Sequence, residues 1–337
     1  MNIKHLSLFS FCFSALFAIS SSHSQSVSVV NDNFSTTAPS SDNNTTDAAY
    51  YGTSGSSAIE FNADSVGLRS GGSGRALHAL FPTQTLENIG DTLIASVTFI
   101  TPPTVNSGTA ASNEEMRIGL FDNLGRTSSE EDTNGNPLGL GQNISNGSTN
   151  LNPLLMGLPG FAAELDIDGE ELTNQDIQIR ISAPTESGRL LGTSSGFDTD
   201  SSSSDNGYII APNTTYTLTM TLEHTTNDGL NINIDFLTEG QLTDSHDFEV
   251  TALTETGEPN PELTFSFGML AMGVSAGPLG SNNDTFDPSS GQPDDNGLNI
   301  LSFTVDSNIA GGNAPAPTDE EICYTISGTD GTSVVCL

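Results

Sequence analysis

The chain has no tryptophan, one lysine and three cysteines in 337 residues. Apart from Lys4 it carries six arginines against 42 acidic residues, a formal net charge of 6 − 42 = −36. Such a surface repels phosphate backbones, which excludes nucleic acid as a partner. Sugar-cleaving clefts use broad aromatic platforms, and a chain with no tryptophan and five tyrosines has little material for one.

Long apolar runs are equally scarce. The exception runs from Leu6 to Ile19, after Lys4 and before a serine-rich stretch that ends near Ser24. This layout predicts a secretory signal peptide over residues 1–24. A membrane anchor is the alternative, but serines interrupt the run and it is too short to span a bilayer. The mature chain is therefore expected to be secreted, with no transmembrane segment, and to lie outside the cell, at its surface or in the periplasm.

The cysteines point to one cross-link. Cys12 leaves with the signal peptide, and an isolated remaining pair in an oxidising compartment, Cys323 and Cys336, predicts a disulfide. Residues 307–318 are a Gly/Pro linker, and residues 319–337 are predicted to form a small hairpin that the disulfide staples. Closing this loop should stabilise the hairpin by about 3 kcal/mol. The functional alternative is a tail that docks on a surface protein partner.

The clearest pattern in the chain spans residues 214–236. Apolar side chains occupy every second position before and after the turn at Asn227-Asp228-Gly229, whose residues tolerate a positive φ: Tyr216, Leu218, Met220 and Leu222, then Leu230, Ile232, Ile234 and Phe236. Threonine, asparagine and acidic residues fill the alternate positions. The pattern predicts a hairpin with one apolar face, which a second layer must cover.

Short strand candidates recur along the chain between clusters of Gly, Asn, Ser and Pro. They fall at residues 26–34, 58–61, 66–68, 76–81, 92–100, 116–121, 162–167, 177–181, 246–253, 263–272 and 300–305. The polar stretch up to Thr53 is expected to be loop. Many short strands with almost no helical period predict an all-β sandwich, or jelly roll, over residues 25–306.

The strand phrases MRIGLFDNLG (116–125), LTFSFGMLAMGV and LNILSFTVDS, together with the hairpin, resemble secreted bacterial domains of the concanavalin A-like lectin/glucanase superfamily. The resemblance covers roughly residues 29–305. It implies two curved antiparallel sheets packed face to face. It also implies a structural calcium ion that joins the first and last strands, here through Asp32 and Asp306. The superfamily includes carbohydrate-binding modules, glycoside hydrolases and polysaccharide lyases, so fold alone does not settle function.

A catalytic candidate lies in the segment GFAAELDIDGEE. Glu164, Asp166 and Asp168 would project from one face of a strand. They resemble the E-x-D-x-E strand of the laminarinase and lichenase group, which implies Glu164 as nucleophile and Asp166 as its electrostatic neighbour. Asp168 departs from that pattern, because it is one methylene shorter than the acid/base glutamate. The alternatives are an exposed acidic face, or a cation loop around Gly169.

A polysaccharide lyase is the other enzymatic interpretation, since lyases pair a Tyr or His base with an Arg or Gln that neutralises the uronate carboxylate. Arg117, Gln178 and Arg180 occupy polar parities of their strands, and His78 and His224 lie near strand ends. None of the strand motifs of jelly-roll alginate lyases is present.

Calcium is the expected cofactor, because carboxylates are the ligands that it prefers. Candidate loops contain Asp198, Asp200 and Asp205, then Asp284 and Asp287, then Asp294, Asp295 and Asn296. The alternative for each loop is that these residues form turns by bonding their own backbone.

These observations favour a secreted, non-catalytic glycan-binding protein. Its expected site is the polar concave face, with Arg117, Glu164, Asp166, Gln178, Arg180 and His224. The alternatives are a carbohydrate-active enzyme on an extracellular polysaccharide, using either set of residues above, and a structural subunit of the cell surface.

Overall fold

The computed structural model describes part of the chain. The described residues are 26–34, 47–53, 59–61, 65–69, 75–103, 115–124, 143–144, 158–166, 177–182, 197–202, 210–226, 228–251, 263–274, 297–309, 323–328 and 331–336. They form β-strands joined by turns, and no helix among them is long and apolar enough to cross a membrane. The expected signal peptide lies outside these residues.

Two eight-stranded sheets make up the body of the protein. Sheet A runs in the order β14 (Gln241–Val250), β13 (Leu230–Thr238), β12 (Thr215–His224), β6 (Thr92–Ile100), β16 (Gly297–Asn308), β4 (Val66–Arg69) and β3 (Ile59–Phe61), with β1 (Val27–Asn33) also paired to β16. Sheet B runs in the order β11 (Phe197–Ser202), β10 (Ile177–Ser182), β9 (Gly160–Asp166), β7 (Glu115–Phe121), β15 (Ser266–Val274), β5 (Arg75–Thr85), β2 (Ala49–Thr53) and β8 (Asn143–Ile144). The described pairings are antiparallel except β2 with β8.

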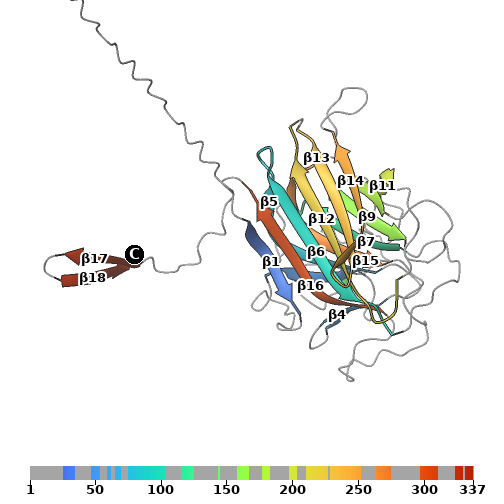
Figure 1. Cartoon of the computed structure of the whole chain (residues 1–337), viewed down its shortest axis with the longest axis horizontal. Helices are drawn as coiled ribbons and strands as arrows, with labels where there is room; N and C mark the ends of the chain where they lie inside the picture. The colour runs from blue at the N-terminus through green and yellow to red at the C-terminus, as the bar shows by residue number, and fades with distance from the viewer. Residues whose placement is uncertain are drawn as a thin grey trace, which may run out of the picture.

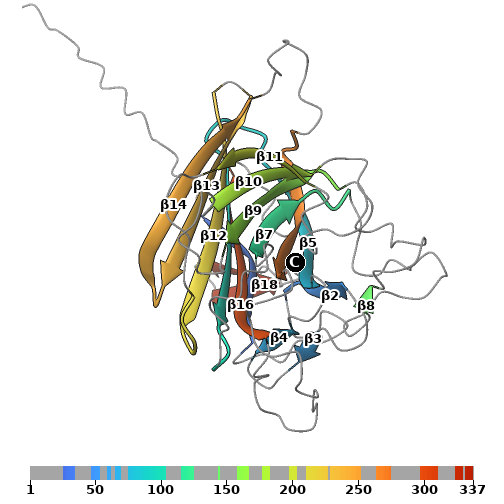
Figure 2. The same cartoon turned by 90° about the vertical axis from the view of Figure 1, so that its right-hand side faces the viewer.

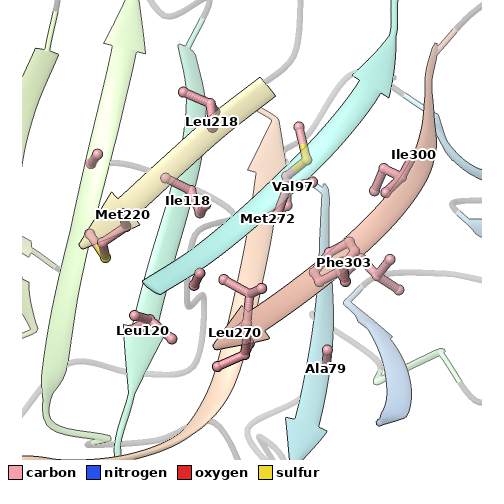
Figure 3. Close-up of a cluster of buried hydrophobic side chains, with 14 of the residues drawn as sticks. Ala79, Val97, Ile118, Leu120, Leu218, Met220, Leu270, Met272, Ile300 and Phe303 are labelled. Carbon is pink, nitrogen blue, oxygen red and sulfur yellow. The ribbon is translucent and has the colours of Figure 1, made fainter. Parts of the chain in front are cut away.

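The sheets pack face to face (Figure 1), and a side view separates β12, β13 and β14 from β7, β9 and β10 (Figure 2). Period-two patterning explains this arrangement, because β12 and β13 are buried at every second residue. Leu218 pairs with Phe236 on one side and Val97 on the other, so the apolar positions of three strands share one face. Figure 3 shows this face meeting Ile118 and Met272 of sheet B. The expected all-β sandwich is confirmed.

Two hairpins fix the register of the far side of sheet A. Between β12 and β13, Asp228 adopts a positive φ of 51°, and the Thr225 amide donates to the Gly229 carbonyl at 2.9 Å. Between β13 and β14, the two loop residues Glu239 and Gly240 have φ of 49° and 75°. Consecutive left-handed residues are the signature of the tight turn whose twist matches its flanking strands.

Some strands lie where the sequence predicted loop. Strand β2 belongs to the polar stretch before residue 53, and β8 and β11 lie in other stretches read as Gly, Asn and Ser clusters. Strand β2 forms because Tyr50 is fully buried in the core, where its ring packs edge-on against Phe34 and Phe303. These partners are distant in sequence, so the local pattern gave no sign of them.

The C-terminal hairpin is also present. Strands β17 (Cys323–Gly328) and β18 (Gly331–Cys336) form a separate two-stranded sheet (Figure 1), and β16 ends at Asn308, two residues past the expected boundary of the sandwich. The register sets Cys323 directly opposite Cys336. Their side chains lie outside the described part, so the disulfide stays a prediction.

Glycine allows β9 to sit close against β7. A Cβ on Gly160 would lie 2.4 Å from the Leu120 carbonyl oxygen and 2.8 Å from the Phe121 Cα. Backbone atoms cannot move aside as a flexible side chain can, so only glycine permits this approach. The approach sets Glu164 of β9 directly opposite Arg117 of β7.

We expect Gly160→Ala to lower the free energy of unfolding by about 1–3 kcal/mol, the usual cost of overpacking. Urea denaturation measures this. The control is Gly240→Asn, at a turn where nothing lies within 4 Å and asparagine tolerates the left-handed backbone; it should change stability by less than about 1 kcal/mol. Equal effects of the two variants would contradict the close approach.

For the hairpin, we expect thiol titration of the exported, unfolded protein to find no free thiol before reduction and two after it. Cys323→Ser should expose one thiol, that of Cys336. Two free thiols in the unreduced wild type would contradict the disulfide.

Candidate functional site

The sheet register brings three of the expected site residues into one row. Arg117 on β7 lies directly opposite Glu164 on β9, which lies directly opposite Gln178 on β10. Residues opposite one another in a sheet project from the same face. The row therefore places a guanidinium, a carboxyl and a carboxamide at neighbouring positions.

This row lies on the outer face of sheet B. Met116 and Ile118, which flank Arg117 in the sequence, both belong to the hydrophobic core between the sheets. Since side chains alternate along a strand, Arg117 projects away from sheet A. Asp166 and Arg180 share its face, and both lie two residues along their strands from the row.

Small residues surround Arg117 on this face. Gly273 lies opposite it on β15, and the next row holds Gly119, Ala162 and Ala271. The Arg117 side chain is nevertheless only 1% exposed. A buried guanidinium stays charged, so it requires counter-charge or hydrogen-bond acceptors close by. Glu164, at the directly opposite position, is the acidic residue that the register provides.

The two histidines are placed differently from each other. His78 lies on the same outer face, fully buried, but β5 is two strands away from β7. His224 lies on the inner side of sheet A, in the parity of Leu222, with its ring 4.5 Å from that of Phe265 and its Nε2 atom 3.6 Å from Asp228. The prediction that His224 joins Arg117 and Glu164 is therefore wrong.

Other expected residues fall elsewhere. Strand β9 ends at Asp166, so Asp168 lies outside the described residues, as do Asp205, Asp284, Asp287 and residues 294–296. Asp198 and Asp200 belong to strand β11, where a loop was expected. The side chains of Glu164, Asp166, Gln178 and Arg180 are placed by their backbone register alone.

Asp32, an expected calcium ligand, is held by other groups. Its Oδ2 accepts a 2.5 Å hydrogen bond from the Tyr50 hydroxyl and a 3.1 Å bond from the Ala48 amide. Its Oδ1 accepts a 2.7 Å bond from the Asp47 amide. Because Asp32 belongs to sheet A and Tyr50 to sheet B, this buried contact links the two layers.

Asp306 does not face Asp32. Asp32 lies opposite Phe303 and is 3% exposed, whereas Asp306 lies opposite the exposed Ser28 on the outer face. A bulge between Ser28 and Val30 in β1 separates the two registers. The two carboxylates thus project to opposite sides of sheet A, and the predicted shared calcium site is wrong. Within the described ranges, no three His, Cys, Asp or Glu side chains form a metal-binding group.

Burial controls the ionisation of the Asp32–Tyr50 pair. Desolvation raises the pKa of Asp32 above its ordinary value of 3.8, although the bonds from Tyr50, Asp47 and Ala48 lower it. Desolvation and the Asp32 charge raise the pKa of Tyr50 well above 10.0. Sequence analysis missed Tyr50. The only available signal was an aromatic pair, Tyr50-Tyr51, in an otherwise polar stretch.

Comparison with known proteins finds similarity in structure alone. No family model matches the chain, and no curated protein matches it. Among solved structures, basic winged bean lectin with Tn-antigen has a TM-score of 0.40 at 12% identity, covering 84% of this chain and 98% of the lectin. Arcelin-5, a lectin-like defense protein from Phaseolus vulgaris, gives 0.40 at 12%, covering 85% and 99%. The Ca2+/Man3GlcNAc-bound VIP36 exoplasmic/lumenal domain gives 0.36 at 9%, covering 78% and 83%. Similarity this low carries no residue roles to this chain.

We expect Tyr50→Phe to lower the free energy of unfolding by about 1.5–3 kcal/mol at pH 7, the range for a hydrogen bond to a charged group. The bond lowers the Asp32 pKa, so its loss raises that pKa further and costs most when Asp32 is ionised. The cost should therefore shrink as pH falls through the folded-state pKa of Asp32. Above pH 10 the Tyr50 hydroxyl loses its proton in the unfolded chain but keeps it in the folded protein, because its folded-state pKa is raised. The free energy of unfolding of the wild type should therefore fall with rising pH, and Tyr50→Phe should lack this contribution.

Urea denaturation of wild type and Tyr50→Phe at acid, neutral and alkaline pH measures these differences in the free energy of unfolding. Tyr216→Phe is the matched control, because the Tyr216 oxygen accepts from the neutral Ala211 amide at 2.8 Å. Its cost should be the same at acid and neutral pH. A Tyr50→Phe cost that does not vary with pH would rule out the coupling to Asp32.

Proposed function

We propose that this chain is an exported, non-catalytic glycan-binding protein whose site is the row of Arg117, Glu164 and Gln178 on the outer face of sheet B. The observation that carries this proposal is the register of β7, β9 and β10, which sets the three residues side by side. They come from segments up to 61 residues apart, since 178 − 117 = 61.

The chemistry of the row suits a polyhydroxylated ligand. A carboxylate accepts hydrogen bonds from sugar hydroxyls, and a carboxamide both donates and accepts. Arg117 is buried, so its role in the proposal is to orient Glu164 rather than to contact the sugar. With no tryptophan to stack on the sugar ring, affinity comes from hydrogen bonding and should be modest.

A binding role is favoured over catalysis for a geometric reason. A retaining glycosidase needs two carboxyl groups about 5–5.5 Å apart, on either side of the scissile bond. In the strand pattern that Glu164 resembles, the acid/base residue stands at position 168, and Asp168 is one methylene shorter than the glutamate that this role requires. A lyase needs a base near the Arg117 row, yet His224 lies on the inner side of sheet A and His78 two strands away.

Export and calcium belong to the same proposal. The signal-like segment over residues 1–24 supports export, which N-terminal sequencing of the protein made in a secreting host would test. The proposal keeps a structural calcium ion, but not at a site shared by Asp32 and Asp306, which project to opposite sides of sheet A. Docking of the C-terminal hairpin, residues 319–337, on a surface protein stays an alternative role for that segment and is not needed for glycan binding.

We expect affinity electrophoresis against a panel of soluble extracellular polysaccharides to retard the wild-type protein on at least one of them, with no release of reducing ends or unsaturated products. Gln178→Ala should weaken that retardation several-fold, since a net hydrogen bond contributes about 0.5–1.5 kcal/mol. Thr85→Val, on the same sheet but outside the row, is the control and should leave it unchanged.

Two outcomes would overturn the proposal. Wild-type protein that binds no member of the panel is not a glycan-binding protein. Product release that disappears in Glu164→Gln would make it an enzyme.

A further inference from the structure

The two outer faces of the sandwich differ in exposure. On sheet B, the outward side chains of His78, Arg117, Ala162 and Ala271 are all buried. On sheet A, the outward residues of β6 and β12 are half-buried or exposed. Half-burial is expected where neighbouring outward side chains partly cover one another. The outward side chains of β6 and β12 are therefore more exposed than these four of sheet B.

The outer face of sheet A carries a regular array of hydroxyl groups, which we call the hydroxyl face. It consists of the outward-facing positions of β6, β12 and β16: Thr92, Ser96, Thr98, Thr215, Thr217, Thr219, Thr221, Ser302 and Thr304. The register aligns them in rows across the strands. One row reads Ser302, Thr98, Thr217, and the next reads Thr304, Ser96, Thr219. Ile94, 38% exposed, is the apolar interruption in the following row.

Hydrogen bonds within the sheet hold these side chains in place. Thr98 and Thr217 share a 3.1 Å hydroxyl contact, and Ser96 and Thr219 share one of 2.9 Å. At the β13 and β14 side, Asn233 Nδ2 donates to Ser245 at 3.0 Å and to Asp247 at 2.9 Å. Side chains already ordered in the free protein lose less conformational entropy when a ligand binds.

The charge on this face selects the class of partner. Strands β6, β12, β13, β14 and β16 contain no lysine or arginine, and Glu223, Asp235 and Asp306 border the hydroxyl face. Polyanions are therefore repelled, and a second copy of this acidic chain is repelled as well. The complementary partner is an uncharged surface rich in hydroxyl groups.

The spacing selects an extended partner. Neighbouring strands lie about 4.8 Å apart, and successive outward residues about 6.7 Å apart along a strand. A compact sugar covers one or two of these positions, whereas a polymer can contact several rows at once. Without aromatic stacking each contact is weak, so binding depends on many contacts made together.

We propose that the hydroxyl face is a second binding surface, for long neutral polysaccharide chains. The proposal rests on the glycan-binding function for its class of ligand, but it uses the opposite sheet from the Arg117 row.

The test is depletion of the full chain from solution by insoluble cellulose, chitin and β-1,3-glucan, with short oligosaccharides of each as competitors. Wild-type protein should be retained by at least one polymer, and retention should survive high salt because the contacts are uncharged. Its own oligosaccharides should compete poorly. The double variant Thr217→Val, Thr219→Val keeps both β-branched shapes and should weaken retention about tenfold through the lost hydroxyls.

Thr85→Val is the matched control, since Thr85 and Ser266 form a similar 3.1 Å hydroxyl contact on sheet B. It should leave retention unchanged, and the melting temperatures of all variants should confirm folding. Absence of retention on every polymer, or undiminished retention of the double variant, would overturn the proposal. The affinity electrophoresis assay with Gln178→Ala tests sheet B. If the protein binds soluble polysaccharide in that assay but no insoluble polymer, the second surface is disproved and the proposed function stands.

Discussion

The structure depends on the separation of apolar and polar side chains at every second residue of the sheet A strands. Three neighbouring strands, β6, β12 and β13, place unbroken apolar columns on one side, and their pairing leaves these columns no partner within the sheet. Sheet B must cover them, and its strands β7 and β15 do so with Ile118, Leu120 and Met272 (Figure 3). Burying apolar area contributes about 25 cal/mol per Å2, so this contact dominates the stability of the fold.

Strong local alternation made much of the fold predictable. Strand β6 begins and ends where its pattern does, β12 begins one residue inside the predicted hairpin, and β13 ends two residues beyond it. Strand β2 was missed because its reason to form, the Tyr50 contact with Asp32, joins residues 18 positions apart on different sheets. Tertiary contacts of that kind override a polar, loop-like composition.

The candidate site was predictable in composition but not in arrangement. Parity placed Arg117, Glu164 and Gln178 on polar faces, yet only the strand order β7, β9, β10 shows that they are adjacent. The same alternation already argued against His224 as a site residue, because it continues the inward-facing series of Tyr216 to Leu222. For Asp32, two consecutive valines and the bulge at residues 28–30 obscured which side of β1 faces the core. A shift of one residue reverses every side chain that follows it.

Strand β14, the last in the described order of sheet A, carries acidic residues along a terminal edge. Asp247 and Glu249 are exposed and alternate with the half-buried His246 and Phe248, and Asp244 is half-buried. Like charges on an unpaired edge oppose its extension by a neighbouring molecule, which is how many β-proteins avoid fibrils. The isoelectric point of about 4.1 lies near the range in which carboxylates take up protons. Acidification toward it removes this electrostatic guard, so storage and purification above that range protect the protein from self-association.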